Sequence, residues 1–217
     1  MADIFQEVDE EVRREQLKKL WDRYGTLLIA ACVLVVAAVG AWRGYEYWQA
    51  KKAGETGLAF EQAMALAETG KHQEAEAAFA KIAASGTTGY RAIARLREAS
   101  ELAQTDKKAA IGAYDALAAD KSGGQVVDDL AAVRAGFLLV DDTPYSEMRQ
   151  RLEPLTAADR TYRHSARELL AFSAWKSGDL TTARKWTDMI MADPETPSGT
   201  RSRAQILSEL IAANGKS

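Results

Sequence analysis

The sequence predicts an all-α protein, with a single N-terminal transmembrane helix followed by a degenerate solenoid of about four helix pairs and a capping helix. A run of 19 residues carries no charged side chain, apolar residues elsewhere recur at helical spacing, and one apolar pattern repeats at steps of 35, 38 and 35 residues. We expect four segments: a cytoplasmic tail (1–23), a transmembrane anchor (24–42), a linker helix (43–56) and a repeat domain (57–217).

The charge-free run lies between Arg23 and Arg43. As an α-helix it would be about 28 Å long, close to the hydrocarbon thickness of a bilayer. A secretory signal has a shorter apolar core of about 7–15 residues behind a short basic start, whereas residues 1–23 form a long acidic segment. The run therefore predicts a retained single-pass anchor. Small residues at Ala38 and Gly40 leave cleavage as one alternative, and a buried core helix is the other.

Aromatic residues flank both ends of the charge-free run. Amphipathic rings of tryptophan and tyrosine settle at the headgroup level of a bilayer. The predicted membrane-interface anchors are Trp21 and Tyr24 at one end, and Trp42, Tyr45, Tyr47 and Trp48 at the other.

The basic residues near the run predict its orientation. Five Lys and Arg residues precede it, and three lie in the 20 residues that follow. Because basic residues favour the cytoplasmic side, we expect a cytoplasmic N-terminus and, in a bacterium, a repeat domain in the periplasm beyond the inner membrane. A cytoplasmic repeat domain is the alternative. The single cysteine, Cys32, lies inside the run, so the expected exported part has no disulfide framework.

The part of the chain after the run is nearly balanced in charge. From Arg43 onward it has 23 Lys and Arg residues against 24 Asp and Glu residues. Nucleic-acid binding needs a strongly basic face. The balance therefore argues against a nucleic-acid partner.

Four apolar triplets with i, i+4, i+7 spacing mark the repeats. They are Ala75/Phe79/Ile82, Ala110/Tyr114/Leu117, Met148/Leu152/Leu155 and Ala183/Thr187/Ile190. A further helical stripe precedes each triplet, at 57–68, 90–104, 126–140 and 160–176. Helix pairs with a period near 34 are typical of tetratricopeptide repeats. A last stripe of Ala204, Leu207 and Ile211, with Ile206 and Leu210 beside it, predicts a helix that caps the array.

In these residues the chain resembles the tetratricopeptide family. The last unit matches the family pattern at Leu170-Ala171, Gly178, Ala183 and Pro194, and the first unit matches at Gly70, Ala75, Phe79 and Ile82. Units two and three lack the turn glycine, and Thr187 stands where the family has an aromatic residue. The alternative is a generic helical bundle.

The sequence shows no pattern of catalysis or of metal binding. Neither His72 nor His164 has ligands at metal-binding spacing, no cysteine lies outside the run, and no Gly-x-Ser-x-Gly motif occurs. Paired acids at 128–129 and 141–142 are expected to serve helix ends. We therefore expect no enzyme activity, no cofactor, no metal and no small-molecule substrate.

The resemblance implies where a partner would bind. In tetratricopeptide proteins the second face of the first helices lines a concave groove that takes extended peptides or partner helices. The corresponding residues here are Phe60, Met64, Val133, Phe137, Phe172, Trp175 and Lys176. The alternative is that a neighbouring helix or the linker helix covers them.

The combination of anchor and repeats resembles a narrower family. The acidic tail, the Trp21 and Tyr24-Gly25 entry and the exit "GAWRGYEYW" are similar to the YfgM-like family of inner-membrane tetratricopeptide proteins that accompany the Sec translocon. This resemblance implies a chaperone-like ancillary subunit whose partners are the Sec translocon, a periplasmic chaperone and exported polypeptides. A structural adaptor that assembles a division or cell-wall complex is the alternative function.

Overall fold

The computed structural model describes residues 2–214, and it describes the side chains of residues 13–15 and 17–213. Every regular element in residues 2–214 is a helix, so the predicted all-helical class is confirmed. The chain divides into two units, Met1–Gly54 and Glu55–Ser217. Helix α1 (Ala2–Glu68) belongs to the first unit up to Gly54 and to the second from Glu55.

The first unit consists of the N-terminal part of α1. No proline precedes Pro144, so nothing in this stretch removes a backbone donor from the helix. In the part of the chain that the structure describes, α1 is the one helix long and apolar enough to cross a membrane, and the apolar window is only 6% buried. A core helix of a soluble protein buries such a surface. The length and apolarity of this segment fit a transmembrane helix.

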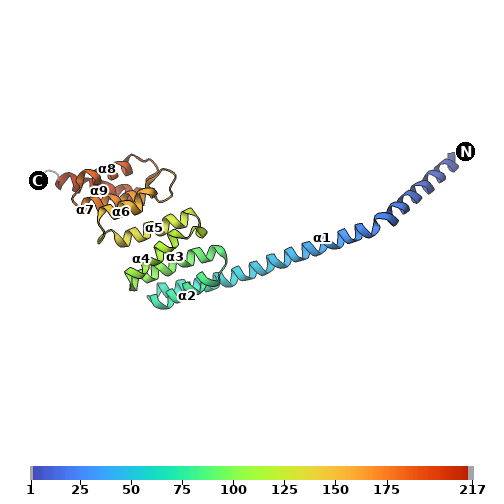
Figure 1. Cartoon of the computed structure of the whole chain (residues 1–217), viewed down its shortest axis with the longest axis horizontal. Helices are drawn as coiled ribbons and strands as arrows, with labels where there is room; N and C mark the ends of the chain where they lie inside the picture. The colour runs from blue at the N-terminus through green and yellow to red at the C-terminus, as the bar shows by residue number, and fades with distance from the viewer. Residues whose placement is uncertain (1, 215–217) are drawn as a thin grey trace. The chain divides into compact units, whose positions relative to one another are not determined.

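The second unit is an array of helices that follow one another in chain order (Figure 1). After the end of α1 come α2 (His72–Ser85), α3 (Thr88–Thr105), α4 (Lys107–Ala119), η1 (Lys121–Gly123), α5 (Gln125–Leu139), α6 (Tyr145–Leu152), η2 (Glu153–Thr156), α7 (Arg163–Lys176), α8 (Leu180–Ala192) and α9 (Ser198–Asn214). The helices α3, α5 and α7 overlap the stripes expected at 90–104, 126–140 and 160–176.

The turns inside the helix pairs follow from local chemistry. Gly70 and Gly178 adopt φ values of 77° and 82°, a region that disfavours a side chain. Asp179 then caps α8, because its side chain accepts a hydrogen bond from the Thr182 amide at 2.9 Å. In the second pair Asp106 alone separates α3 from α4, and its carboxylate accepts from the Ala109 amide.

Helix α6 begins one residue later than its proline indicates. A proline after Asp141-Asp142-Thr143 favours a helix with Pro144 at its first position. In the structure Pro144 is still extended (φ −60°, ψ 149°) and α6 begins at Tyr145. Pro144 is therefore the capping residue, and its carbonyl accepts from the Glu147 and Met148 amides, each at 3.1 Å.

Three clusters of buried side chains form the core of the second unit. The first joins the end of α1 with α2 and α3 through Ala63, Phe79 and Ala94. The second joins α3, α4 and α5 around Ala99, Tyr114 and Ala135. The third is the largest and joins α5 to α9; it comprises Val133, Met148, Leu152, Leu155, Ala166, Leu169, Leu170, Ala171, Ala174, Ala183, Trp186, Leu207 and Ile211. All four predicted triplets are buried, and they therefore define the core side of the second helix of each pair.

Candidate partner-binding surface

Two of the predicted groove residues, Phe60 and Met64, pack into the first core cluster. The Phe60 ring lies 5.3 Å from the Phe79 ring in an edge-to-face arrangement and 5.7 Å from the Tyr90 ring. Aromatic pairs at such distances stabilise a packed core. Both residues are half-buried and hold the end of α1 against α2 and α3.

Two other predicted groove residues, Val133 and Trp175, belong to the third core cluster or pack against it. Val133 is 3% exposed and lies among the core residues of α5, α6 and α7. Trp175 is half-buried and packs against the same cluster. Neither presents a whole side chain to a partner.

The remaining predicted groove residues stand on the surface. Phe137 on α5 is 50% exposed, Phe172 on α7 is 36% exposed, and Lys176 is exposed. Each phenylalanine directly follows a buried small residue, Gly136 or Ala171. Helices α5 and α7 contact one another, so the two rings stand on neighbouring helices.

A Cβ added at Gly136 would lie 3.1 Å and 3.2 Å from the two Leu152 methyl carbons, and 3.2 Å from Leu169. This glycine therefore allows α5 to approach α6 and α7 closely.

Three further exposed residues on α3 and α5 were not among the predicted groove residues. Ile93 on α3 is 48% exposed, and Arg97 and Arg134 are exposed on α3 and α5. Each arginine stands two positions before a buried small residue, Ala99 or Gly136. Their helical spacing is visible in the sequence, but their lack of an ion-pair partner among the described side chains is not. We define the α3–α5–α7 surface as Ile93, Arg97, Arg134, Phe137, Phe172 and Lys176.

The charges of both arginines of this surface act on the buried Tyr114 phenol. Burial, together with the negative charge of Glu101, raises the pKa of the Tyr114 phenol, while a hydrogen bond with Ser100 and the positive charges of Arg134 and Arg97 act to lower it. Neither guanidinium forms an ion pair with another of the described side chains. By contrast, Arg95 pairs with Asp120, Arg151 with Asp115 and Arg160 with Asp129.

The paired acids at 128–129 lie near the start of α5 as expected, with Asp128 in its first turn, but the helix begins after Gly124 and neither acid is its cap. Both carboxylates are buried near the start of the helix. Asp129 accepts two hydrogen bonds from Arg160, at 3.0 and 3.2 Å, and Asp128 lies 3.6 Å from the Lys121 ammonium. These acids hold neighbouring segments together.

A polar cluster joins the start of α7 to the loop after α8. Asp193 accepts hydrogen bonds at 3.0 Å from both Arg163 and Arg167. The hydrogen bond from Arg163, supported by the Glu195 amide and Arg167, lowers the pKa of the Asp193 carboxyl although burial opposes the shift. Among the described side chains no group of three or more His, Cys, Asp or Glu residues could hold a metal ion. These ion pairs hold the start of α7 against the loop after α8.

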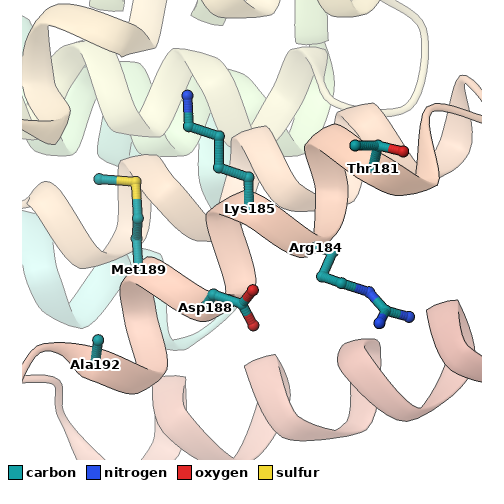
Figure 2. Close-up of a pocket in the computed structure, with 6 residues that line it drawn as sticks. All are labelled: Thr181, Arg184, Lys185, Asp188, Met189 and Ala192. Carbon is teal, nitrogen blue, oxygen red and sulfur yellow. The ribbon is translucent and has the colours of Figure 1, made fainter.

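A hollow of about 480 Å³ lies along α8. Its lining residues are Thr181, Arg184, Lys185, Asp188, Met189 and Ala192, and Figure 2 shows Lys185 and Arg184 extending to different sides of the helix. One helix supplies the whole lining, so no second wall encloses a small molecule.

The last helix covers the end of the array as expected. Ala204, Leu207 and Ile211 are buried. Arg203 donates two hydrogen bonds to the buried Glu168 carboxylate of α7, the one from Nη2 at 2.9 Å. Ile206 and Leu210 are exposed beside the buried stripe.

The predicted interface aromatics of the first unit are all exposed along α1. The Arg23 guanidinium lies 5.6 Å from the Tyr24 ring centre, and the Lys52 ammonium lies 5.5 Å from the Trp48 ring centre. Cation–π contacts of this kind keep amphipathic rings beside a charge.

Comparison with known proteins gives one family. Residues 18–186 match the family described as tetratricopeptide repeat-like domain, a match that includes the charge-free run and all but the last part of the array. Neither a curated protein nor a solved structure matches the chain. The helix pairs, the turn glycines and this match over most of the sequence agree, and the chain belongs to the tetratricopeptide repeat-like domain family.

Proposed function

We propose that the protein is a non-enzymatic, membrane-anchored module that binds other proteins. Residues 24–42 cross the bacterial inner membrane once, residues 1–23 lie in the cytoplasm, and the repeat domain works in the periplasm. The observation that carries the proposal is the exposed, charge-free segment of α1 in the same chain as a tetratricopeptide repeat-like array. The excess of basic residues before the segment supports the orientation.

The more specific part of the proposal is an ancillary, chaperone-like role at the Sec translocon. Its support is the resemblance of the tail and of the exit stretch around Trp42 and Tyr45 to the YfgM-like family. The module would receive exported polypeptides or recruit a periplasmic chaperone. Anchoring confines it beside its partners and raises their effective concentration, so weak contacts suffice.

Orientation is tested with reporters fused after Ser217. Alkaline phosphatase is active only outside the cytoplasm, and we expect an active fusion, whereas a fluorescent protein that matures only in the cytoplasm should stay dark. The opposite pattern would place the repeats in the cytoplasm and end the translocon role.

The partner class is tested by photo-cross-linking from Phe137, which is half exposed. We expect a spread of cross-links to newly exported chains together with translocon subunits. A single stoichiometric envelope partner would instead support the alternative, an adaptor that assembles a division or cell-wall complex. Cross-linking from the buried Leu170 is the matched control and should give no partners.

A further inference from the structure

We propose that the α3–α5–α7 surface binds an extended acidic segment of a protein partner. Carboxylates of the segment pair with Arg97 and Arg134, and an apolar side chain of the segment packs on Phe137 and Phe172. This inference rests on the proposed protein-binding function and adds the chemistry of the partner.

These residues stand on the first helices of three successive helix pairs. Helix α3 contacts α5, and α5 contacts α7. Arg97 and Arg134 each stand two residues before a buried small residue, and Phe137 and Phe172 each stand one residue after one. Because residues three apart are neighbours on a helix surface, Arg134 lies beside Phe137 on α5.

The arginines carry the argument for an acidic partner. Arginines that link neighbouring helix pairs here have carboxylate partners, as in Arg151 with Asp115 and Arg160 with Asp129. Arg97 and Arg134 form no ion pair within the described part of the chain, although both lie close enough to Tyr114 for their charges to act on its hydroxyl. A guanidinium offers a planar fork of donors that fits a carboxylate, and a bidentate pair is among the stronger polar contacts.

The phenylalanines supply the apolar part of the contact. Aromatic residues and arginine dominate the binding energy of protein interfaces. Phe137 and Phe172 expose 50% and 36% of their surface although their neighbours Gly136 and Ala171 are buried. A binding surface with two arginines unpaired among the described residues, beside two exposed rings, therefore fits a segment that alternates acidic and apolar side chains.

The charges at this position in successive units also predict where along the array the acidic segment binds. Glu61 stands two residues before the buried Ala63, which is the place that Arg97 and Arg134 take in the next two units. An acidic segment is therefore repelled at the first unit and attracted at the second and third. Anionic lipid is the less suitable ligand, because lipid surfaces are recognised by clusters of about 4–8 basic residues.

The test uses the full chain in nanodiscs of neutral phosphatidylcholine. The probes are two fluorescent 12-residue peptides with the same apolar residues, one with four Glu and one with four Lys. We expect the Glu peptide to bind at least about tenfold more tightly, and its affinity to fall as salt is raised from about 50 to 300 mM. Equal binding of the two peptides would overturn the inference.

Matched variants assign the binding to the surface. The double variant Arg97→Gln/Arg134→Gln should weaken binding of the Glu peptide by about tenfold or more, since each lost charge-assisted contact contributes to affinity. Arg91→Gln/Arg184→Gln removes two exposed arginines outside the surface and should leave affinity unchanged. Phe137→Ser should weaken the Glu peptide without making the Lys peptide bind. An unchanged affinity in the Arg97/Arg134 variant would contradict the proposal.

Two further readouts separate the possible failures. Vesicles with added phosphatidylglycerol are offered to the wild type and to the double variant. Loss of vesicle binding alone, with peptide binding unaffected, would identify lipid as the ligand and overturn the inference.

Cross-linking from Phe137 in cells tests the proposed function separately. Client cross-links that persist in the double variant would leave protein binding intact and refute the acidic preference, whereas no cross-links in either chain would refute protein binding itself.

Discussion

His164 is a buried side chain whose protonation is linked to folding. Its Nδ1 lies 3.1 Å from the Thr196 hydroxyl oxygen, and that hydroxyl donates to the Ile190 carbonyl at 2.7 Å. The hydroxyl has one hydrogen, so its oxygen is left to accept from an Nδ1–H of His164. Burial, helped by the charge of Arg163, lowers the pKa of His164. The folded state therefore favours the neutral ring.

This predicts a pH dependence between about pH 7.5 and 5.5. The pKa of His164 is lower in the folded state than the value near 6.5 of the unfolded chain. Its stabilising effect is therefore complete above the unfolded pKa and is lost as pH falls toward the folded pKa. The urea concentration at the midpoint of unfolding should fall more between these two pH values in the wild type than in His164→Gln. An equal fall of the midpoint in the two proteins would show that His164 is not the group responsible.

Phe79 offers a second prediction for a single residue. It is fully buried and contacts the Phe60 ring. Phe79→Ala should lower the free energy of unfolding by about 3–5 kcal/mol, because the substitution removes buried apolar surface and leaves a cavity. Phe172→Ala, at a partly exposed position, is the control and should cost about 1 kcal/mol or less. Urea unfolding followed by circular dichroism measures both, and similar losses would show that Phe79 is not a core residue.

For the helices, an ion pair joins α9 to α7 beside the apolar contacts. Glu168 is 4% exposed, and Arg203 supplies two hydrogen bonds to its carboxylate. Arg203→Leu should destabilise the fold by about 1–3 kcal/mol, since it leaves a buried acceptor without its donors. The same change in a Glu168→Gln background should cost less. A double-mutant cycle measured by urea unfolding checks this coupling, and additive effects would rule it out.

Much of the helix arrangement was predictable, because the apolar spacing that marks a buried face survives in each unit. The steps of 35, 38 and 35 residues place the second helices, and the predicted triplets are buried throughout. The sequence shows Thr187 where the family has an aromatic residue, but it does not show which residue supplies a buried ring instead. Trp186 supplies the buried ring from the preceding position, and its Nε1 donates to the Tyr145 hydroxyl at 3.0 Å.

The candidate surface was less predictable than the helices. Spacing along a helix shows which residues share a face, but the rotation of that helix against its neighbours decides which of them stay exposed. Val133 and Phe137 are four residues apart on α5, and yet one is in the core and the other is half exposed. Arg97 and Arg134 escaped notice because an unpaired charge cannot be recognised until the possible partners have been placed.

For the whole molecule, the division into two units predicts separable behaviour. All members of the three core clusters lie between residues 59 and 211, within the second unit. A chain of residues 55–217 should therefore fold alone, with a helical circular-dichroism spectrum and a cooperative thermal transition. A spectrum without helix or an aggregated product would contradict this.

Membrane attachment should depend on the first unit. The full chain should stay with the membrane fraction in alkaline carbonate, whereas residues 55–217 should appear in the supernatant. Release of the full chain by carbonate would show that the charge-free segment does not span the bilayer.

The unequal size of the core clusters has a consequence for amide hydrogen exchange. Among the described residues the third cluster has 13 buried members and the other two have five each. Local opening is easiest where few apolar side chains are buried, so amides of α2 and α3 should exchange faster than those of α7. The α3–α5–α7 surface extends from the part that we expect to exchange faster to the part that we expect to exchange more slowly. A segment bound across it should slow exchange in α3, because a ligand stabilises the closed state to which it binds.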